Sequence, residues 1–245
     1  MKIIFACAGL QTRWNGYMGC PKQLVPIDGQ PLLLRNILLF KKLYPGFPPY
    51  VSVHVGSSSP EHGPYAVHPD IVFIPIEDPS GVPAYKSLLP FHQDCDTLIL
   101  LGDVLFTEQC AAKIRDTIDH APNDLLVFGR KGASPITGCA WGELFAFYIP
   151  RSYLSSWTKA ISVTEALYRA GKLSRFSGWE IICCIYSGAA NDLSRAPDAK
   201  IRKAFQTKQF PDSFIEINDE TDDFDYPEDY ERWRTRSRHG FAKAK

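Results

Sequence analysis

The chain opens with a short apolar segment that runs directly into a loop of small and basic residues. Ile3, Ile4 and Phe5 are branched or aromatic, as in a buried strand, and the sequence ACAGLQTR follows at 6–13. Gly9 supplies the backbone freedom that a tight turn after the strand needs, and small residues let the backbone pass close to a ligand. The opening therefore predicts a phosphate-binding loop at the end of the first strand.

Arg13 and Lys22 add two positive charges beyond this turn. A guanidinium makes bidentate contacts with phosphate, and an ammonium is a compact point charge that suits phosphate oxygens. The spacing fits neither a Walker A loop, which needs a second glycine directly before Lys and Ser or Thr, nor the dinucleotide fingerprint of three spaced glycines. Basic residues in exposed loops are usually only solvated, and this alternative stays open.

The loop resembles the signature of the nucleotidyltransferases of the GT-A-like fold, which activate sugar phosphates, choline phosphate or acidic sugars as nucleotide conjugates. Their pattern is a strand, Ala-Ala-Gly-x-Gly-x-Arg, a variable stretch, then Pro-Lys-x-Leu and a short apolar helix. This chain has ACAG at 6–9, Arg13, and PKQLVPIDGQPLL at 21–33. It departs from the pattern at Cys7, which is conservative in volume, and at Gln11, where a second glycine is common.

The resemblance implies a role for each residue of this loop. Lys22 would neutralise the α-phosphate or the acceptor phosphate, and Arg13 the β- and γ-phosphates, which makes both catalytic. A second segment, PSGVPAYKSL at 79–88, resembles the family's base-recognition segment, although an ordinary turn into a helix is the alternative. The implied nucleotide-binding residues are Ala8, Gly9, Leu10, Gln11, Arg13, Lys22, Gly81 and Ser87.

Asp103 follows an apolar run, LILLG at 98–102. A carboxylate at this point makes little sense as packing, and ligands of open α/β sheets gather outside the carboxyl ends of the strands. The segment also resembles the family's Gly-Asp segment, whose aspartate binds the metal, and this implies Mg²⁺ as the cofactor. A carboxylate that caps the following helix is the alternative.

A second acidic group lies in TDDFDYPEDYERW at 221–233. In an extended segment Asp223 and Asp225 share a face, so both can point at one hard cation. The segment resembles the Asp-x-Asp-x-Pro-Glu-Asp-Leu ending of the acid-sugar cytidylyltransferases, in which this pair completes the metal site. Glu228 and Asp229 are expected to favour the start of a helix at Pro227. Glu216 and Asn218 have the same spacing and remain an alternative ligand pair.

Two tripeptides, WGE at 141–143 and GWE at 178–180, place an aromatic ring beside a carboxylate. Such pairs can hold sugar hydroxyls or an amine-bearing head group, so Trp141, Glu143 and Trp179 are predicted to bind the acceptor. Packing in the aromatic core is the alternative.

Strand-like and helix-like stretches alternate along the chain, which predicts an α/β fold. We expect a single-domain Rossmann-like GT-A fold, with a mostly parallel central sheet and helices on both faces, over residues 1–233. Residues 234–245 are expected to form a basic, flexible tail, because the stretch from Arg232 onward has no apolar face; polyanion binding is the alternative. The expected strands are 2–7, 50–55, 71–76, 97–101, 125–129, 138–149 and 214–218, and the expected helices 32–43, 108–120, 152–171 and 178–186.

The composition limits the classes of binding partner that the chain is expected to have. The formal net charge is zero, so no overall field draws the chain to nucleic acid or to an anionic membrane. The seven cysteines show no metal-binding spacing, which favours reduced thiols in the cytoplasm, and no signal peptide or membrane-spanning run is visible. The expected partners are a nucleoside triphosphate and a small-molecule acceptor, and a homodimer is compatible with the sequence.

Together these features favour a metal-dependent nucleotidyltransferase that condenses a nucleoside triphosphate, with CTP weakly favoured, with a phosphorylated or acidic acceptor and releases pyrophosphate. An acceptor that is already an anion needs no protein base. Two alternatives remain. A glycosyltransferase of the same fold would use a nucleotide sugar and would want a mid-chain Asp-x-Asp; Asp103 is followed by Val104 and Leu105, and Asp94 and Asp96 have the spacing but precede the strand. A non-catalytic relative would bind nucleotide without turnover.

Overall fold

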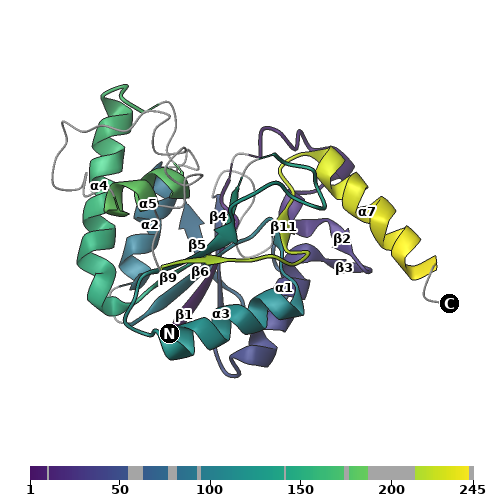
Figure 1. The fold of residues 1–245 in the computed structure, drawn as a ribbon, viewed down its shortest axis with the longest axis horizontal. Helices are drawn as coiled ribbons and strands as arrows, with labels where there is room; N and C mark the ends of the chain where they lie inside the picture. Colours follow the sequence, from purple (N-terminus) through teal and green to yellow (C-terminus); the bar gives the residue numbers. More distant parts are fainter. Residues whose placement is uncertain are drawn as a thin grey trace.

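The computed structural model describes residues 1–9, 11–54, 63–76, 82–92, 95–140, 142–173, 177–186 and 213–242. Its centre is a seven-stranded sheet in the order β10-β8-β9-β6-β1-β4-β5 (Figure 1). Neighbouring strands are parallel except for β9, which runs antiparallel to both β6 and β8. The strands are β1 (Lys2–Ala6), β4 (Pro49–His54), β5 (Val72–Ile76), β6 (Thr97–Leu101), β8 (Leu126–Arg130), β9 (Glu143–Ile149) and β10 (Phe214–Glu216).

The first strand lies inside the sheet, between β4 and β6, with Phe5 opposite Val51 and Leu100. Ile3, Ile4 and Phe5 are all fully buried, because both faces of the sheet are covered. Strand β6, predicted to be central from its apolar run, lies beside it and ends at the residue expected.

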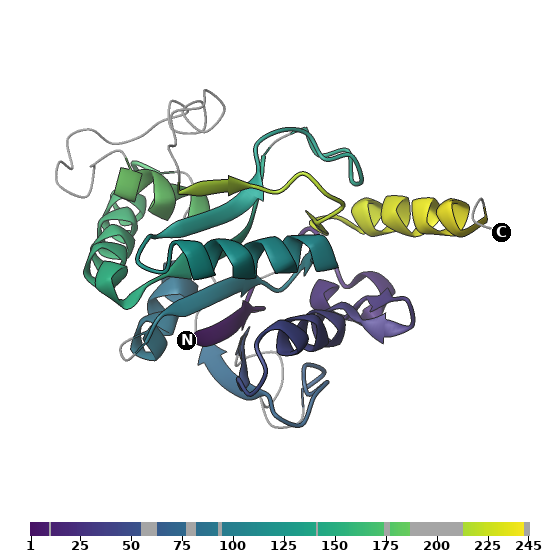
Figure 2. The same cartoon turned by 60° about the horizontal axis from the view of Figure 1, so that its bottom comes forward.

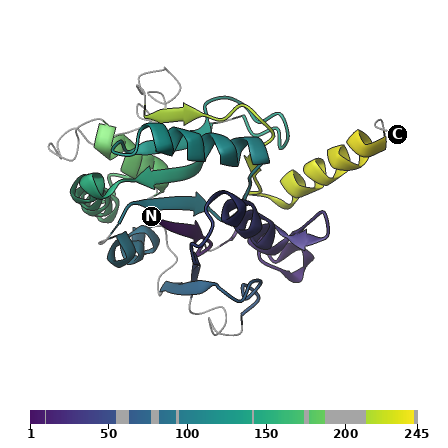
Figure 3. The same cartoon turned by 90° about the horizontal axis from the view of Figure 1, so that it is seen from below.

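Helices cover both faces of the sheet (Figures 1 and 3). On one face α1 (Leu32–Leu43) and α3 (Glu108–His120) pack with Phe5 in one core. On the other, α2 (Val82–His92), α4 (Leu154–Arg169) and α5 (Gly178–Tyr186) surround Ile4. The structure thus confirms the predicted α/β fold with a mostly parallel sheet covered on both sides.

Two small sheets and several short helices complete the described part. The two-stranded sheets are β2 (Pro26–Ile27) with β3 (Gln30–Pro31) and β7 (Val104–Leu105) with β11 (Asp222–Asp223), both antiparallel. The 3₁₀ helices are η1 (Tyr17–Gly19), η2 (Lys22–Leu24) and η4 (Arg151–Tyr153). Pairing of β11 with β7 brings the acidic C-terminal segment beside the residues that follow β6. Among the described residues, no helix has the length and apolar character needed to cross a membrane.

The C-terminal helix α7 (Pro227–Ala242) differs from the expectation of a frayed tail. Tyr230 and Trp233 stack at 5.8 Å and pack with Phe224 against Trp14 of the N-terminal loop. Beyond this aromatic cluster α7 continues away from the sheet as regular helix (Figure 2). The expected break at residue 233 therefore falls inside a helix, because the aromatic contacts anchor its first half and the helical hydrogen bonds continue beyond them.

The segment 138–149 was expected to be strand throughout, and only Glu143–Ile149 is. Gly138 has a left-handed backbone, with φ of +75°, which a strand does not accommodate. Residues 131–140 instead belong to the connection between β8 and β9, which approaches β11.

His92, at the end of α2, carries a testable stability effect. It is 1% exposed, and neither ring nitrogen has a hydrogen-bond partner in the described structure. Burial, aided by the charge of Lys2, lowers the pKa of His92 from 6.5 to about 4. Between these values the unfolded chain binds a proton that the folded protein does not, so stability is complete above pH 6.5 and falls as the pH is lowered toward 4.

At about 1.4 kcal/mol per pKa unit, His92 should account for about 2 kcal/mol of the stability lost between pH 7 and pH 5. Between pH 7 and pH 5, the free energy of unfolding of His92→Leu should therefore fall by about 2 kcal/mol less than that of the wild type. Urea unfolding at the two pH values measures this difference. The exposed His120 provides the control, since His120→Gln should keep the wild-type loss. Equal losses in wild type and His92→Leu would show that His92 is protonated in the folded protein.

Candidate active site

Lys22 lies at the centre of a cluster of charged side chains drawn from three distant parts of the chain. It begins η2 after Pro21, and its Nζ forms ion pairs with Asp103, which follows β6, and with Asp225, which follows β11, the latter at 3.1 Å. The Lys22 side chain is only 11% exposed. The structure therefore brings together the basic loop and both predicted acidic segments.

These carboxylates determine the charge of Lys22. Burial alone would lower the pKa of its ammonium, but the negative charges of Asp103 and Asp225 outweigh burial and raise the pKa above its usual value. Lys22 is thus fully protonated at neutral pH.

Asp103 is held near the N-terminal loop by the close approach of β6 to β1. The Gly102 amide donates to the Ala6 carbonyl at 3.0 Å. A Cβ at Gly102 would lie 2.9 Å from that carbonyl oxygen and would also meet the Cys7 sulfur. Glycine at this position allows Asp103 to come within reach of Lys22.

Arg13 lies at the rim of the cluster, with a side chain that is 51% exposed. Its guanidinium pairs with Asp225 and lies 5.4 Å from the centre of the Tyr226 ring. Burial would raise the pKa of Asp225, but Lys22 and Arg13 outweigh it and hold that pKa below its usual value. Asp225 is therefore an ionised carboxylate shared by both basic residues of the loop.

Gln11 explains how the loop keeps its shape without the second glycine. Its φ is +50°, in the left-handed region that glycine adopts most easily. Its side chain accepts from the Lys22 amide at 2.9 Å and donates to the Tyr65 hydroxyl at 3.1 Å. The side chain thus ties the start of the loop to Lys22. Nearby, Ala8 is buried in the sheet core and Gly9 is exposed, while Leu10 lies outside the described residues.

Asp223, in β11, lies opposite Val104 of β7, and its carboxylate is close to the other acidic groups. Burial, followed by the charges of Glu143, Asp225 and Asp103, raises the pKa of Asp223 well above its usual value. Burial also raises the pKa of Glu143 to about 7, although the Cys139 thiol donates to its carboxylate at 3.2 Å. Both shifts reflect several carboxylates crowded into one buried region.

The chemistry of this donor set fits a divalent cation. Asp103, Asp223, Asp225 and Glu143 provide hard oxygen ligands, which Mg²⁺ prefers. If all four are ionised, Lys22 and Arg13 balance two of the four negative charges, and one divalent cation balances the remaining two. Among the described residues, no group of three Asp, Glu, His or Cys side chains is already close enough to hold a metal, and Lys22 contacts Asp103 and Asp225 instead.

The other predicted residues either belong to different parts of the fold or lie outside the described part of the chain. Ser87 is half-buried in α2, and Trp179 in α5 packs partly against the core on that face of the sheet. Gly81 and Trp141 lie outside the described residues. Glu216 forms an ion pair with Lys131 at 3.7 Å, and Asn218 is exposed.

Sequence reasoning missed Arg130 and Asp222, which form a buried ion pair next to Asp223. A signal for Arg130 existed, because a charge directly after the apolar run LLVFG is as unusual as Asp103 after its own run. Asp222 was hidden within an acidic segment. In an extended chain, however, it faces away from Asp223.

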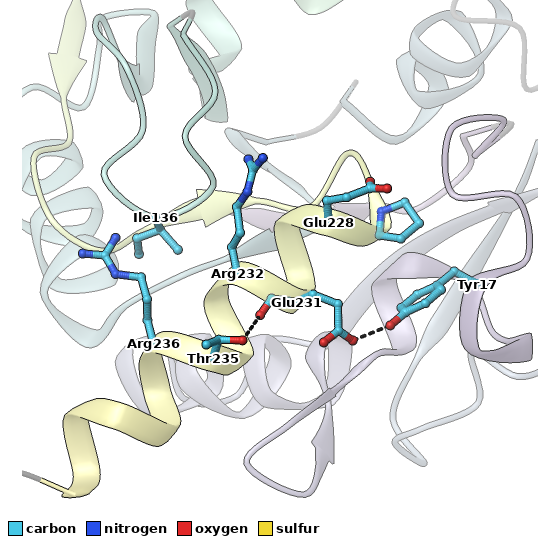
Figure 4. A pocket seen from close by; sticks show the side chains of 8 residues that line it. Tyr17, Ile136, Glu228, Glu231, Arg232, Thr235 and Arg236 are labelled. Carbon is cyan, nitrogen blue, oxygen red and sulfur yellow. Dashed lines mark hydrogen bonds between the residues drawn. The ribbon is translucent and has the colours of Figure 1, made fainter.

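A groove of about 660 Å³ runs along α7, between this helix and the segments that carry Tyr17 and Ile136 (Figure 4). Tyr17, from the N-terminal loop, donates to Glu231 at one side, and Ile136 lies at the other. Arg232 points from α7 toward the segment that carries Ile136 (Figure 4). The groove thus separates the N-terminal loop from the β8–β9 connection.

Three solved structures share this architecture over nearly their whole length. The CTP:phosphocholine cytidylyltransferase of Streptococcus pneumoniae has a TM-score of 0.53 and 13% identity, with 96% of this chain and 97% of that chain covered. A Bacillus anthracis protein assigned as a glucose-1-phosphate thymidylyltransferase has a TM-score of 0.55 and 14% identity, over 97% and 95% of the two chains. A UDP-glucose pyrophosphorylase complexed with UDP-glucose has a TM-score of 0.57 and 10% identity, over 97% and 98%.

The chain has the nucleotidyltransferase fold. This confirms the fold that the N-terminal resemblance implied. No protein-family model matches the chain, and no curated protein matches it in sequence. At identities of 10–14% the nucleotidyltransferase fold is what these structures have in common with this chain, and substrate and mechanism must be argued from its own residues.

Proposed function

We propose that this protein is a Mg²⁺-dependent nucleotidyltransferase that joins a nucleoside triphosphate to a phosphorylated or acidic small molecule and releases pyrophosphate. The observation that carries the proposal is the shared contact of Lys22 with Asp103 and Asp225 in a protein of this fold. A purely structural lysine has no need of two carboxylates from different segments, one of them 203 positions away in the sequence.

The reaction must bring together two anions, the triphosphate and the acceptor, and the residues of the cluster have different roles in this. Lys22 and Arg13 bind the phosphates and stabilise the charge that develops on the leaving pyrophosphate. Asp103, Asp223 and Asp225 would hold the cation, and Glu143 would contact the acceptor. Mg²⁺, when bound, neutralises phosphate charge and polarises the reacting phosphorus. The protein contributes mainly positioning, so no side chain is assigned as a general base.

CTP is the triphosphate that we favour. The Asp-x-Asp-x-Pro-Glu-Asp ending at 223–229 resembles that of the acid-sugar cytidylyltransferases, and one structure of the same fold is a CTP:phosphocholine cytidylyltransferase. The acceptor class is broader, since sugar phosphates, amino-alcohol phosphates and acidic sugars all present the required anion.

Pyrophosphate release tests the proposal. We expect the purified protein with Mg²⁺ to release pyrophosphate from one triphosphate when a suitable acceptor is added from a panel of sugar 1-phosphates, amino-alcohol phosphates and acidic sugars. Reactions without acceptor, or with EDTA in place of Mg²⁺, provide the controls. Release of nucleoside diphosphate from a nucleotide sugar would instead indicate a glycosyltransferase. Binding of nucleotide without turnover across the panel would indicate a non-catalytic relative.

A further inference from the structure

A buried ion pair lies directly beside the acidic cluster. Arg130, at the end of β8, donates through Nη2 to Asp222 Oδ1 at 2.7 Å, and the two side chains are 6% and 1% exposed. Nη1 of Arg130 also donates to the Thr221 carbonyl at 3.2 Å, and its guanidinium lies 5.4 Å from the centre of the Phe145 ring. Desolvation offsets much of the attraction in a buried pair, so its effect on position can matter more than its effect on stability.

The same carboxylate organises the segment 131–142, which joins β8 to β9. Asp222 Oδ2 accepts from the Ser134 hydroxyl and from the Thr137 amide, the latter at 3.2 Å. Ser134 Oγ in turn accepts from the amides of Ile136 and Thr137 at 3.0 and 2.9 Å. The described part of this segment is therefore folded around a carboxylate that belongs to β11.

Helix α7 holds the segment from its other side. Arg232 donates to the Thr137 carbonyl, and it points across from α7 toward the segment that carries Ile136 (Figure 4). Strand β11 and α7 flank Asp225 in the sequence. The segment that leads into Glu143 is thus tied at one residue, Thr137, to the elements on both sides of Asp225.

Asp222 also fixes the backbone of its neighbour. Its Oδ1 accepts from the Asp223 amide at 3.1 Å, and β11 pairs with β7 next to Asp103. One buried carboxylate therefore contacts the strand that presents the predicted metal ligands and the segment that leads to the predicted acceptor side.

We propose that Asp222 is a positioning residue, which orients the Asp223 and Asp225 carboxylates and residues 131–140 as one unit. The proposal rests on the proposed function. In that reaction Asp222 determines where the cation lies relative to the acceptor. It does so through its neighbours, because Asp222 itself contacts neither the cation nor the acceptor. Arg130 holds the Asp222 side chain in place through their buried ion pair.

Asp222→Asn tests this role, because it keeps the size of the side chain and removes its charge. The probe is Mn²⁺ with inorganic pyrophosphate, whose binding is followed by electron paramagnetic resonance and does not depend on the base or the acceptor. We expect Mn²⁺ to bind about 10-fold more weakly to the variant, in line with other residues that orient metal ligands. In turnover assays, the KM for the acceptor should rise by a similar factor and the KM for the triphosphate should change little.

Ile161→Ala provides the matched control. Ile161 is fully buried in α4, against the other face of the sheet, so its truncation lowers the melting temperature without touching the cluster. It should leave Mn²⁺ binding and both KM values unchanged. Arg130→Lys keeps the charge and should fall between the wild type and Asp222→Asn.

Asp222→Asn that folds and binds Mn²⁺ and acceptor like the wild type would overturn the positioning role. If that variant does not fold, Ser134→Ala decides: a raised acceptor KM supports the proposal, and an unchanged one contradicts it. Failure of the wild-type protein itself to bind Mn²⁺ with pyrophosphate would overturn the proposed function, which keeps the two failures distinct.

Discussion

Lys22→Met is expected to lower kcat/KM for pyrophosphate release by about 100- to 1,000-fold, the range seen when one preorganised charge-stabilising group is removed from an active site. Methionine keeps most of the buried stem of Lys22 and removes its charge. The loss has two causes. The phosphates lose a cation, and Asp103 and Asp225 are left facing each other without the ammonium that pairs with both.

Lys42→Met is the matched control for this experiment. Lys42 lies in α1 with a side chain that is 72% exposed, and it pairs with Glu108 at 3.5 Å on the surface. Its substitution should leave activity within about twofold of the wild type, because exposed pairs of this kind contribute little. Near-normal turnover by a folded Lys22→Met protein would contradict the assignment of Lys22 to the reaction.

Asp103→Asn is expected to lower kcat by about 100-fold or more and to raise the Mg²⁺ concentration needed for half-maximal rate. The amide keeps the shape of the carboxylate but has one oxygen where a cation would find two, and it carries no charge. It also removes one of the two ion pairs of Lys22. A Mg²⁺ titration of initial rates separates the effect on the metal from the effect on turnover.

Asp116→Asn serves as the control for Asp103→Asn. Asp116 lies on the surface of α3, with a side chain that is 58% exposed, and pairs with Arg115 at 2.9 Å. The Mg²⁺ dependence of this variant should match that of the wild type. An Asp103→Asn protein with the same Mg²⁺ dependence as the wild type would leave Asp223 and Asp225 as the metal ligands and remove Asp103 from the set.

The elements that the sequence predicted best are those whose limits are set by local chemistry. The helix 32–43 follows Pro31 and ends before Pro45 and Gly46, and the structure has it over the same residues. The strand 97–101 is apolar throughout, as a strand buried on both faces must be, and it too has the bounds expected. In both cases neighbouring residues carry all the information that is needed.

Long-range contacts account for what the sequence did not reveal. Strand alternation places Asp222 on the opposite face from Asp223 and Asp225, but only the tertiary fold brings Arg130 to Asp222 and Lys22 to Asp225. Likewise α7 lacks an apolar face beyond Trp233, so its continuation to Ala242 follows from the anchoring of its first half. The roles of Ser87 and Trp179 stay predictions, because neither belongs to the cluster around Lys22.

The pairing of Lys22 with Asp225 spans 203 positions in the sequence, and this separation bears on how the protein is made. During synthesis Lys22 emerges from the ribosome long before Asp225 and the aromatic residues of α7. Closing so long a loop is entropically unfavourable until most of the sheet has formed. A growing chain on the ribosome therefore cannot complete the charged cluster until Asp225, 203 positions after Lys22, has been synthesised.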